Sequence, residues 1–171
     1  MTRILLTVFF VLVVAGLDGK VVSLSIKFMN CEWGISPGEA IAVLKGEIPD
    51  IDIKEINLKY EDKKIGMREF IAYSFPFVGY KWRLKLIFLD DKLSYVVITS
   101  TGKTPNRLKV SKELRAEFGE YETVLDAWEV WNAIDGSHLM VIEAKAPRKA
   151  VIIAYQCPGY MEEIKKRKKK S

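Results

Sequence analysis

Alternation of hydrophobic and polar residues is the commonest pattern in this chain. Apolar residues occupy the even positions from Val22 to Phe28, with serine or lysine between them. A period of two is typical of a β-strand that buries one face. Further runs of this kind, separated by turn residues, lie at positions 55–60, 67–75, 80–88, 93–100, 123–133, 138–145 and 149–156.

Two segments have helical spacing instead, and each begins with a capping signal. Ser36 is suited to an N-cap, Pro37 to the first helical position, and Glu39 to closing a capping box, so we predict a helix that ends at Gly46. A second helix is predicted from Thr104, which precedes a proline, to Gly119. Ser36 is therefore expected to hold backbone amides rather than to act as a nucleophile.

The order of these elements predicts an α+β fold. After the first strand the chain is interpreted as two tandem units, each a helix followed by three strands. We expect the helices to pack on one face of an antiparallel sheet. The repeat is one of architecture rather than of sequence.

The N-terminal residues predict a secretion signal. The chain has 171 residues, enough for one domain. Arg3 precedes an uncharged apolar run from Ile4 to Gly16, which is shorter than the roughly 20 residues of a membrane-spanning helix. We interpret residues 1–16 as a signal peptide, residues 17–160 as one domain, and residues 161–171 as a basic disordered tail. The expected location is periplasmic or secreted; an uncleaved anchor or a buried first strand is the alternative for residues 1–16.

Two cysteines lie near the ends of the expected mature domain. In an oxidising compartment an isolated pair commonly forms a disulfide, so we predict a Cys31–Cys157 bond. The alternative is two buried free thiols. His138 is the only histidine, so neither a Cys/His metal site nor any other metal or cofactor is expected.

The basic charge is concentrated at the C-terminus. The formal net charge is +5, and six basic residues occupy positions 165 to 170, so the 21 other Lys and Arg residues are balanced by 22 Asp and Glu. Such a tail could contact an anionic membrane surface. Nucleic-acid binding is not expected, because the body is nearly neutral. The basic residues are Lys165, Lys166, Arg167, Lys168, Lys169 and Lys170.

Three short motifs resemble those of a group of small secreted bacterial proteins of uncharacterised function. They are F-x-x-x-x-W-G-x-S-x-x-E at Phe28–Glu39, F-L-D-D-K-L at Phe88–Leu93 and L-R-A-E-F-G at Leu114–Gly119, followed by a tryptophan-bearing strand. The arrangement is similar to the β-lactamase inhibitor protein and to the outer-membrane assembly lipoprotein BamE of the SmpA/OmlA type. The resemblance implies a secreted or periplasmic module that binds other proteins, and it carries over no catalytic residue. The chain has no lipid-attachment cysteine, unlike the BamE type.

No motif in the sequence predicts catalysis. The stretch from Ser100 to Thr104, STGKT, has Val97 where a phosphate-binding loop needs glycine. Ser137 and His138 are adjacent, and neighbouring residues do not usually face each other as a catalytic pair. The acidic pairs at 61–62 and 90–91 are expected in hairpin turns.

Three tryptophans on predicted strands are candidate binding residues: Trp82, Trp128 and Trp131. The odd separation of Trp128 and Trp131 predicts that one packs under the helices and the other faces outward. An outward tryptophan on a sheet can anchor a protein partner. The alternative is packing against a neighbouring strand or loop.

The sequence thus favours a non-enzymatic module that binds another secreted or envelope protein. Two alternatives stay open. One is a small secreted hydrolase whose site forms only in three dimensions, and the other is a membrane-surface protein that acts through its basic tail.

Overall fold

The computed structural model of the chain describes residues 13–15, 21–23, 26–101, 106–123, 128–144 and 150–170, with the backbone alone for 13–15, 21–23 and 122–123. Most of the signal-peptide segment, residues 1–12 and 16, lies outside these ranges. Within them, eight strands form one antiparallel sheet in the order β3-β4-β5-β6-β10-β9-β8-β7. The strands are β3 (Lys54–Ile56), β4 (Met67–Phe77), β5 (Tyr80–Leu89), β6 (Lys92–Ser100), β7 (Glu122–Thr123), β8 (Trp128–Asn132), β9 (His138–Ala144) and β10 (Ala150–Gln156), with β1 (Val13–Ala15) and β2 (Val21–Ser23) paired separately.

The sheet consists of two meanders joined at its centre. Strands β3 to β6 pair in chain order, as do β7 to β10, and the second meander returns to place β10 beside β6. In this central pairing Tyr95 lies opposite Gln156, and Thr99 lies opposite Ile152. The predicted α+β class with an antiparallel sheet is confirmed.

The predicted tandem of a helix and three strands is wrong in detail. Four described strands, rather than three, follow each of the helices α1 (Pro37–Glu47) and α3 (Arg107–Phe118). The run at 55–60 ends as a strand at Ile56, and the acidic pair at 61–62 lies in a short helix, α2 (Tyr60–Lys64), rather than in a hairpin turn. A fourth helix, α4 (Tyr160–Lys170), follows the last strand.

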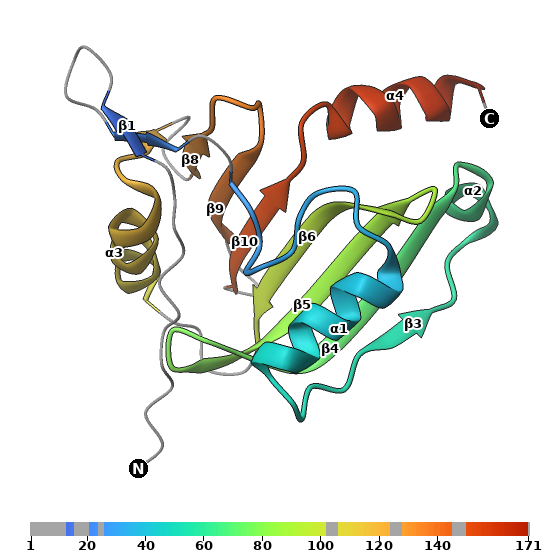
Figure 1. The fold of residues 1–171 in the computed structure, drawn as a ribbon, viewed down its shortest axis with the longest axis horizontal. Helices are drawn as coiled ribbons and strands as arrows, with labels where there is room; N and C mark the ends of the chain where they lie inside the picture. Colours follow the sequence, from blue (N-terminus) through green and yellow to red (C-terminus); the bar gives the residue numbers. More distant parts are fainter. Residues whose placement is uncertain are drawn as a thin grey trace.

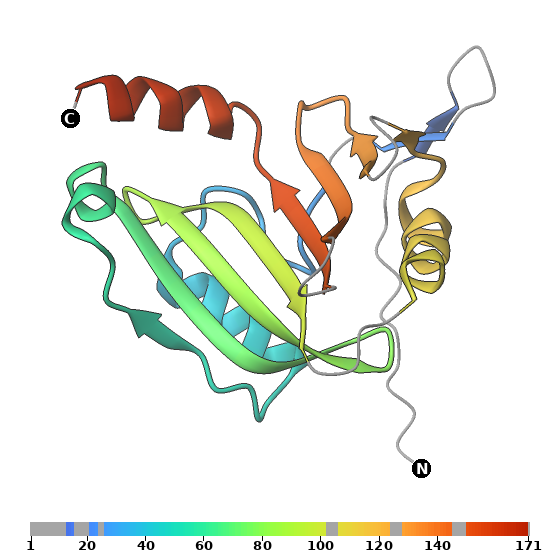
Figure 2. The same ribbon diagram turned by 180° about the vertical axis from the view of Figure 1, so that it is seen from behind.

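The helices lie on both faces of the sheet. Helices α1 and α3 contribute to one core, and Figure 1 shows α1 in front of β4 and β5, whereas Figure 2 shows these strands from behind with α1 beyond them. Helix α4 contacts the other face. There the Tyr160 ring stacks on Tyr95, with the ring centroids 4.8 Å apart. Tyr95 points to that face because its neighbour Val96 is fully buried in the core and side chains alternate along a strand.

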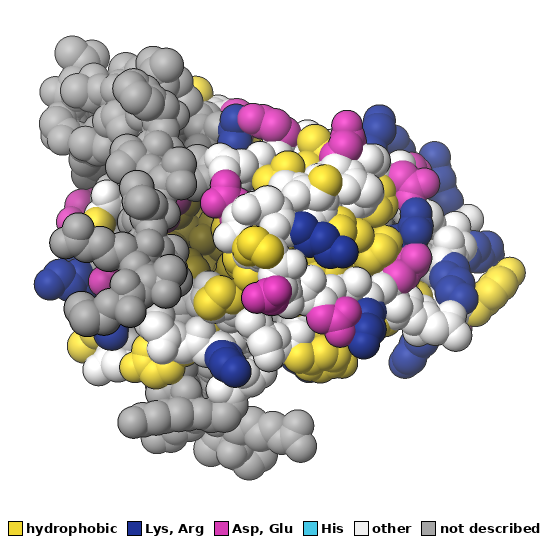
Figure 3. All heavy atoms as spheres, turned by 60° about the horizontal axis from the view of Figure 1, so that its bottom comes forward, with side chains coloured by type: hydrophobic (Ala, Val, Ile, Leu, Met, Phe, Trp, Pro, Cys, Tyr) yellow, Lys and Arg dark blue, Asp and Glu magenta, His cyan; other side chains and the backbone are white. Residues whose placement is uncertain are grey.

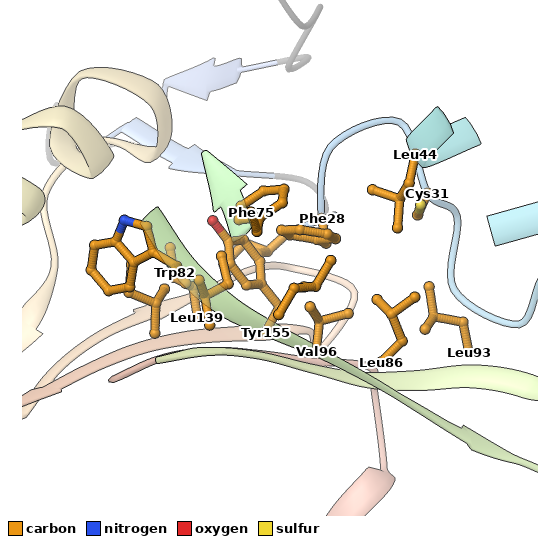
Figure 4. Packing of buried hydrophobic residues seen from close by; sticks show 14 of the residues in the cluster. Phe28, Cys31, Leu44, Phe75, Trp82, Leu86, Leu93, Val96, Leu139 and Tyr155 are labelled. Atoms are coloured by element: carbon orange, nitrogen blue, oxygen red, sulfur yellow. The ribbon is translucent and has the colours of Figure 1, made fainter. Parts of the chain in front are cut away.

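The core is a continuous layer of aromatic and aliphatic side chains between α1, α3 and the sheet (Figure 4). Phe28 connects the parts of this core. The centroid of its ring lies 5.6 Å from that of Phe75 and 5.3 Å from that of Tyr155. The ring centroid of Tyr155 in turn lies 6.4 Å from that of Phe118 in α3. Because Phe28 precedes α1 and Tyr155 lies on β10, these contacts join the two meanders.

The helix ends follow the expected capping chemistry at two of four predicted positions. Helix α1 does not end at Gly46 as predicted, because it continues to Glu47 and has Ile48 as its C-cap. Ser36 accepts a hydrogen bond from the Glu39 amide, and the Glu39 carboxylate accepts one from the Ser36 amide at 2.8 Å, so the capping box is confirmed. The Ser36 hydroxyl also donates to the Glu39 carboxylate at 2.7 Å, and this bond, together with the one from the Ser36 amide, lowers the pKa of Glu39. Gly119 ends α3 with φ of 80°, as predicted. The cap at the start of α3 is Asn106 instead of Thr104, and its side chain accepts from the Leu108 amide at 2.8 Å.

The predicted Cys31–Cys157 disulfide is wrong, because both cysteines are free. Cys31 is fully buried in the core, where Figure 4 shows it beside Leu44 of α1. Cys157 follows the end of β10, and its amide donates to the Ser94 carbonyl at 3.0 Å. Burial raises the pKa of the Cys31 thiol to about 12, so this side chain packs as a neutral core residue.

We predict that Ser36→Ala lowers the free energy of unfolding by about 1 kcal/mol, because the substitution removes the N-cap of α1. Urea denaturation followed by circular dichroism measures the change. Ser74→Ala, at an exposed position of β4, is the matched control and should change stability by less than about 0.5 kcal/mol. Equal stability of the two variants would contradict a role of the capping box in holding α1 on the sheet.

Candidate functional site

The sheet face opposite α1 and α3 carries a row of apolar side chains across β8, β9 and β10. Trp128 lies directly opposite Ile142, and Ile142 lies opposite Ile152. Trp128 is 39% exposed, and the two isoleucines are half-buried. Residues that face each other across antiparallel strands have Cβ atoms about 5 Å apart, so the three side chains form one contiguous surface.

A second row lies beside the first and extends onto β6. It runs from Val130 through Met140 and Ala154 to Val97, again through directly opposed positions. The three larger side chains are half-buried, whereas Ala154 is almost fully buried between its neighbours. We call the two rows together the apolar strip: Trp128, Ile142, Ile152, Val130, Met140, Ala154 and Val97.

Polar residues border the apolar strip on two sides. Towards the α4 end, Nδ1 of the His138 ring donates to the Asn132 amide oxygen at 2.7 Å. Towards β5, Arg83 is exposed, and Lys85 forms a 2.8 Å ion pair with Glu69. An apolar centre with a polar border is the usual anatomy of a protein-binding surface.

The three tryptophans that the sequence analysis names as candidate binding residues differ in their exposure to solvent. Trp128 faces outward and Trp131 is buried, which confirms the prediction from their odd separation. The Trp131 indole donates to the Gly119 carbonyl at 2.8 Å and so secures the end of α3. Trp82 is fully buried and donates to the Phe77 carbonyl at 2.7 Å. Trp82 and Trp131 are therefore core residues, and Trp128 alone of the three is available to a partner.

Ser137 and His138 do not form a catalytic pair. The Ser137 hydroxyl is fully buried, accepts a hydrogen bond from the Ile26 amide at 2.8 Å and donates to Asp135. His138 lies on the other face of the sheet, at the border of the apolar strip. The serine thus fixes the segment before α1 to the turn between β8 and β9.

The predicted disordered tail is corrected by the structure, which has helix α4 from Tyr160 to Lys170. Arg167 explains why this charged segment is held in place. Its Nε donates to Glu163 at 2.7 Å, its Nη2 to Asp90 at 2.7 Å, and its Nη1 to the Ile65 carbonyl at 2.8 Å. With the Tyr160–Tyr95 stack, α4 is attached to the body at two points about two turns apart.

The charge pairs at this attachment are formed at neutral pH. Hydrogen bonds from Arg167 lower the pKa of Asp90 and of Glu163. A carboxylate whose pKa is lowered by folding adds stability above its ordinary pKa and loses it as the pH falls through the lowered value. The attachment of α4 is therefore expected to weaken only in acid.

Gly66 leaves room for the Asp90 carboxylate and the Arg167 guanidinium to meet. Its φ is +78°, and a Cβ at this position would lie 2.1 Å from the Asp90 carboxylate and 3.1 Å from Arg167. A larger residue would be strained and would displace the carboxylate that Arg167 binds. The Asp90 amide also donates to the Gly66 carbonyl at 2.9 Å.

An open hollow of about 450 Å³ lies beside this attachment, between β3, β4 and the β5–β6 turn. Arg68 occupies its wall and binds Glu55 through two bonds of 2.7 and 2.9 Å, and Asp91 through one of 2.6 Å. These bonds lower the pKa of Glu55. Each carboxylate of the hollow thus forms an ion pair with an arginine, an arrangement that suits a structural role better than proton transfer.

Two further features bear on possible sites, a metal-binding cluster and a membrane-spanning helix. Among the described residues, no group of three or more His, Cys, Asp or Glu side chains is arranged to hold a metal ion. In the same part of the chain, no helix is both long and apolar enough to cross a membrane.

No protein-family model matches the chain, and no curated protein sequence matches it either.

Sequence reasoning missed the apolar strip as a unit and the role of Arg167. The alternating pattern predicted each strand, but the strip depends on which strands are neighbours. Arg167 lies in a run of lysines, and nothing in the run marks one residue as the contact to Asp90, which lies 77 positions earlier.

We predict that Arg167→Gln releases α4 from the body. Hydrogen exchange of the amides of residues 160–170 should become markedly faster, while protection of β5 and β6 stays unchanged, because the lost bonds hold the helix rather than the sheet. The matched control is Lys166→Gln, which removes one charge from the adjacent exposed position. Equal exchange in both variants would show that Arg167 does not hold the helix.

Proposed function

We propose that this protein is a secreted or periplasmic binding module without catalytic activity, and that it docks another protein on the apolar strip. The observation that carries the proposal is the continuity of the strip: seven apolar side chains lie side by side across four strands, with Trp128 at one end. The antiparallel sheet holds these side chains in fixed positions. A rigid surface loses little conformational entropy when a partner binds.

The composition of the strip supports a protein as the partner. Tryptophan and methionine are enriched at the centres of protein interfaces, and tryptophan is among the residues that contribute most binding energy. Trp128 is exposed enough to insert into a partner, and Ile142 lies directly opposite it on β9. The resemblance of the short sequence motifs to inhibitor-like and BamE-like modules adds support from a separate source.

We predict that a photoreactive residue placed at position 128 crosslinks to a protein in the secreted or envelope fraction of the native host. Trp128 lies at the exposed end of the strip, so a bound partner should be within reach of this position. The matched control carries the same residue at position 108, since Leu108 of α3 is 69% exposed but lies outside the strip. The same crosslinked bands from both positions would contradict docking on the strip.

Once the crosslinked protein is identified, Trp128→Ser with Ile142→Ser should weaken its binding by at least about 30-fold, the effect of losing one interface hot spot. Isothermal calorimetry measures the affinity. Leu108→Ser is again the control and should leave the affinity unchanged. Thermal unfolding of each variant shows that the fold is intact.

The proposed location has its own test. The apolar run after Arg3 predicts cleavage by signal peptidase, so we expect the mature protein to begin near Leu17. Intact-mass analysis of the protein isolated from its native host measures this directly. A full-length mass would contradict secretion through a cleaved signal.

A further inference from the structure

Positive charge is gathered at the end of the molecule formed by α2 and the C-terminal half of α4. We call this surface the basic end. Figures 1 and 2 both show the two helices next to each other there, and Figure 3 shows Lys and Arg side chains gathered around the end of the molecule on the right. Its exposed members are Lys59, Tyr60, Lys63, Lys64, Lys165, Lys166, Lys169 and Lys170.

The lysines of α4 point outward because Arg167 points inward. Arg167 uses three donor nitrogens on the body of the protein. With 3.6 residues per turn, Lys165 and Lys169 lie on the side of the helix opposite Arg167, and Lys166 and Lys170 lie on the adjoining flank, about 100° and about 60° from Arg167. All four are exposed. An ordered helix thus presents four ammonium groups as one surface, which a disordered tail would not do.

Helix α2 extends this surface and adds an aromatic ring. The Ile65 carbonyl at the end of α2 is the acceptor for Arg167, so the two helices are joined directly. Tyr60, the first residue of α2, is 75% exposed and stands between Lys59 and the lysines at 63 and 64. The basic end therefore combines charge with an aromatic side chain that protrudes into solvent.

The positive charge of the basic end is not spread over the molecule, because the rest of the protein is nearly neutral. Outside positions 165 to 170, the chain has 21 basic and 22 acidic residues. The acidic residues within the two helices are Glu61, Asp62, Glu162 and Glu163, and Glu163 is engaged with Arg167. The protein is thus a nearly neutral body with a cationic end, and an anionic surface would orient it by that end.

We infer that the basic end docks on an anionic lipid bilayer. Lysines attract the bilayer surface, and tyrosine and other amphipathic or apolar side chains are favoured in its interfacial region. The neighbouring hollow argues against a nucleic-acid strand, which needs a positively charged groove. This hollow is lined by Glu55, Asp90 and Asp91 together with Lys63 and Arg68, so it is not a positively charged groove. A flat bilayer can contact the protruding side chains without entering the hollow.

The test compares two variants with the same net charge. One replaces Lys165, Lys166, Lys169 and Lys170 with glutamine, and the other replaces four exposed lysines elsewhere, Lys45, Lys54, Lys81 and Lys112. Binding of the full chain is measured by co-sedimentation with vesicles of phosphatidylcholine containing phosphatidylserine, and with pure phosphatidylcholine as reference. Hydrogen exchange verifies that α4 is intact in each protein.

We expect the intact chain to bind only the anionic vesicles, and more weakly as salt rises. The α4 variant should lose several hundred-fold in partitioning, since each lysine near an anionic surface contributes about one kcal/mol. Tyr60→Ser should weaken binding several-fold, and the control variant should bind nearly as the intact chain does. This inference is independent of the proposed protein docking, so Trp128→Ser should leave vesicle binding unchanged.

Three outcomes would overturn the inference. One is an equal loss in the α4 and control variants, because net charge alone would then explain binding. Another is equal binding of the intact chain to neutral and anionic vesicles. The third is tighter binding to a single-stranded or double-stranded DNA oligonucleotide than to the anionic vesicles at the same salt concentration, which would make nucleic acid the better partner.

Discussion

The pairing of β6 with β10 is the interaction on which the rest of the structure depends. Five residue pairs, from Ile152–Thr99 to Gln156–Tyr95, join two meanders that would otherwise each have an open edge. The same strands bring Val96 and Tyr155 into one core, where Phe28 covers them. Because β10 ends beside β6, the chain leaves the sheet where α4 can cross to the β5–β6 turn.

This pairing also completes one of the two surfaces that we associate with function, the apolar strip. On one side of β10 the neighbours β9 and β8 supply most of the apolar strip, and on the other side β6 completes it with Val97. The strip lies on the face of the sheet that α1 and α3 leave uncovered, since both helices pack on the opposite face. The basic end forms separately, where α4 meets α2 through Arg167. The molecule thus has an apolar surface on its sheet and a cationic surface on two of its helices, and the two surfaces share no residue.

The contacts of one side chain, Arg167, hold the basic C-terminal segment against the body of the protein. The sequence presents six successive basic residues, which are typical of a solvated tail. In the fold, one of the six binds Asp90, Glu163 and a backbone carbonyl, and Tyr160 stacks on Tyr95. The remaining lysines are then arranged by helical geometry. Gly66 permits this contact because a side chain at its position would occupy the space of the Asp90 carboxylate.

The sequence by itself determined what depends on neighbours a few residues apart. It predicted most strands, the capping box at Ser36, the end of α3 at Gly119, and the opposite directions of Trp128 and Trp131. These features follow from strand alternation and from short hydrogen bonds. Tertiary structure alone decided that Cys31 and Cys157 stay apart, that seven residues of four strands form the apolar strip, and that Arg167 holds α4. Each of these depends on contacts between distant segments, and no local pattern specifies which segments meet.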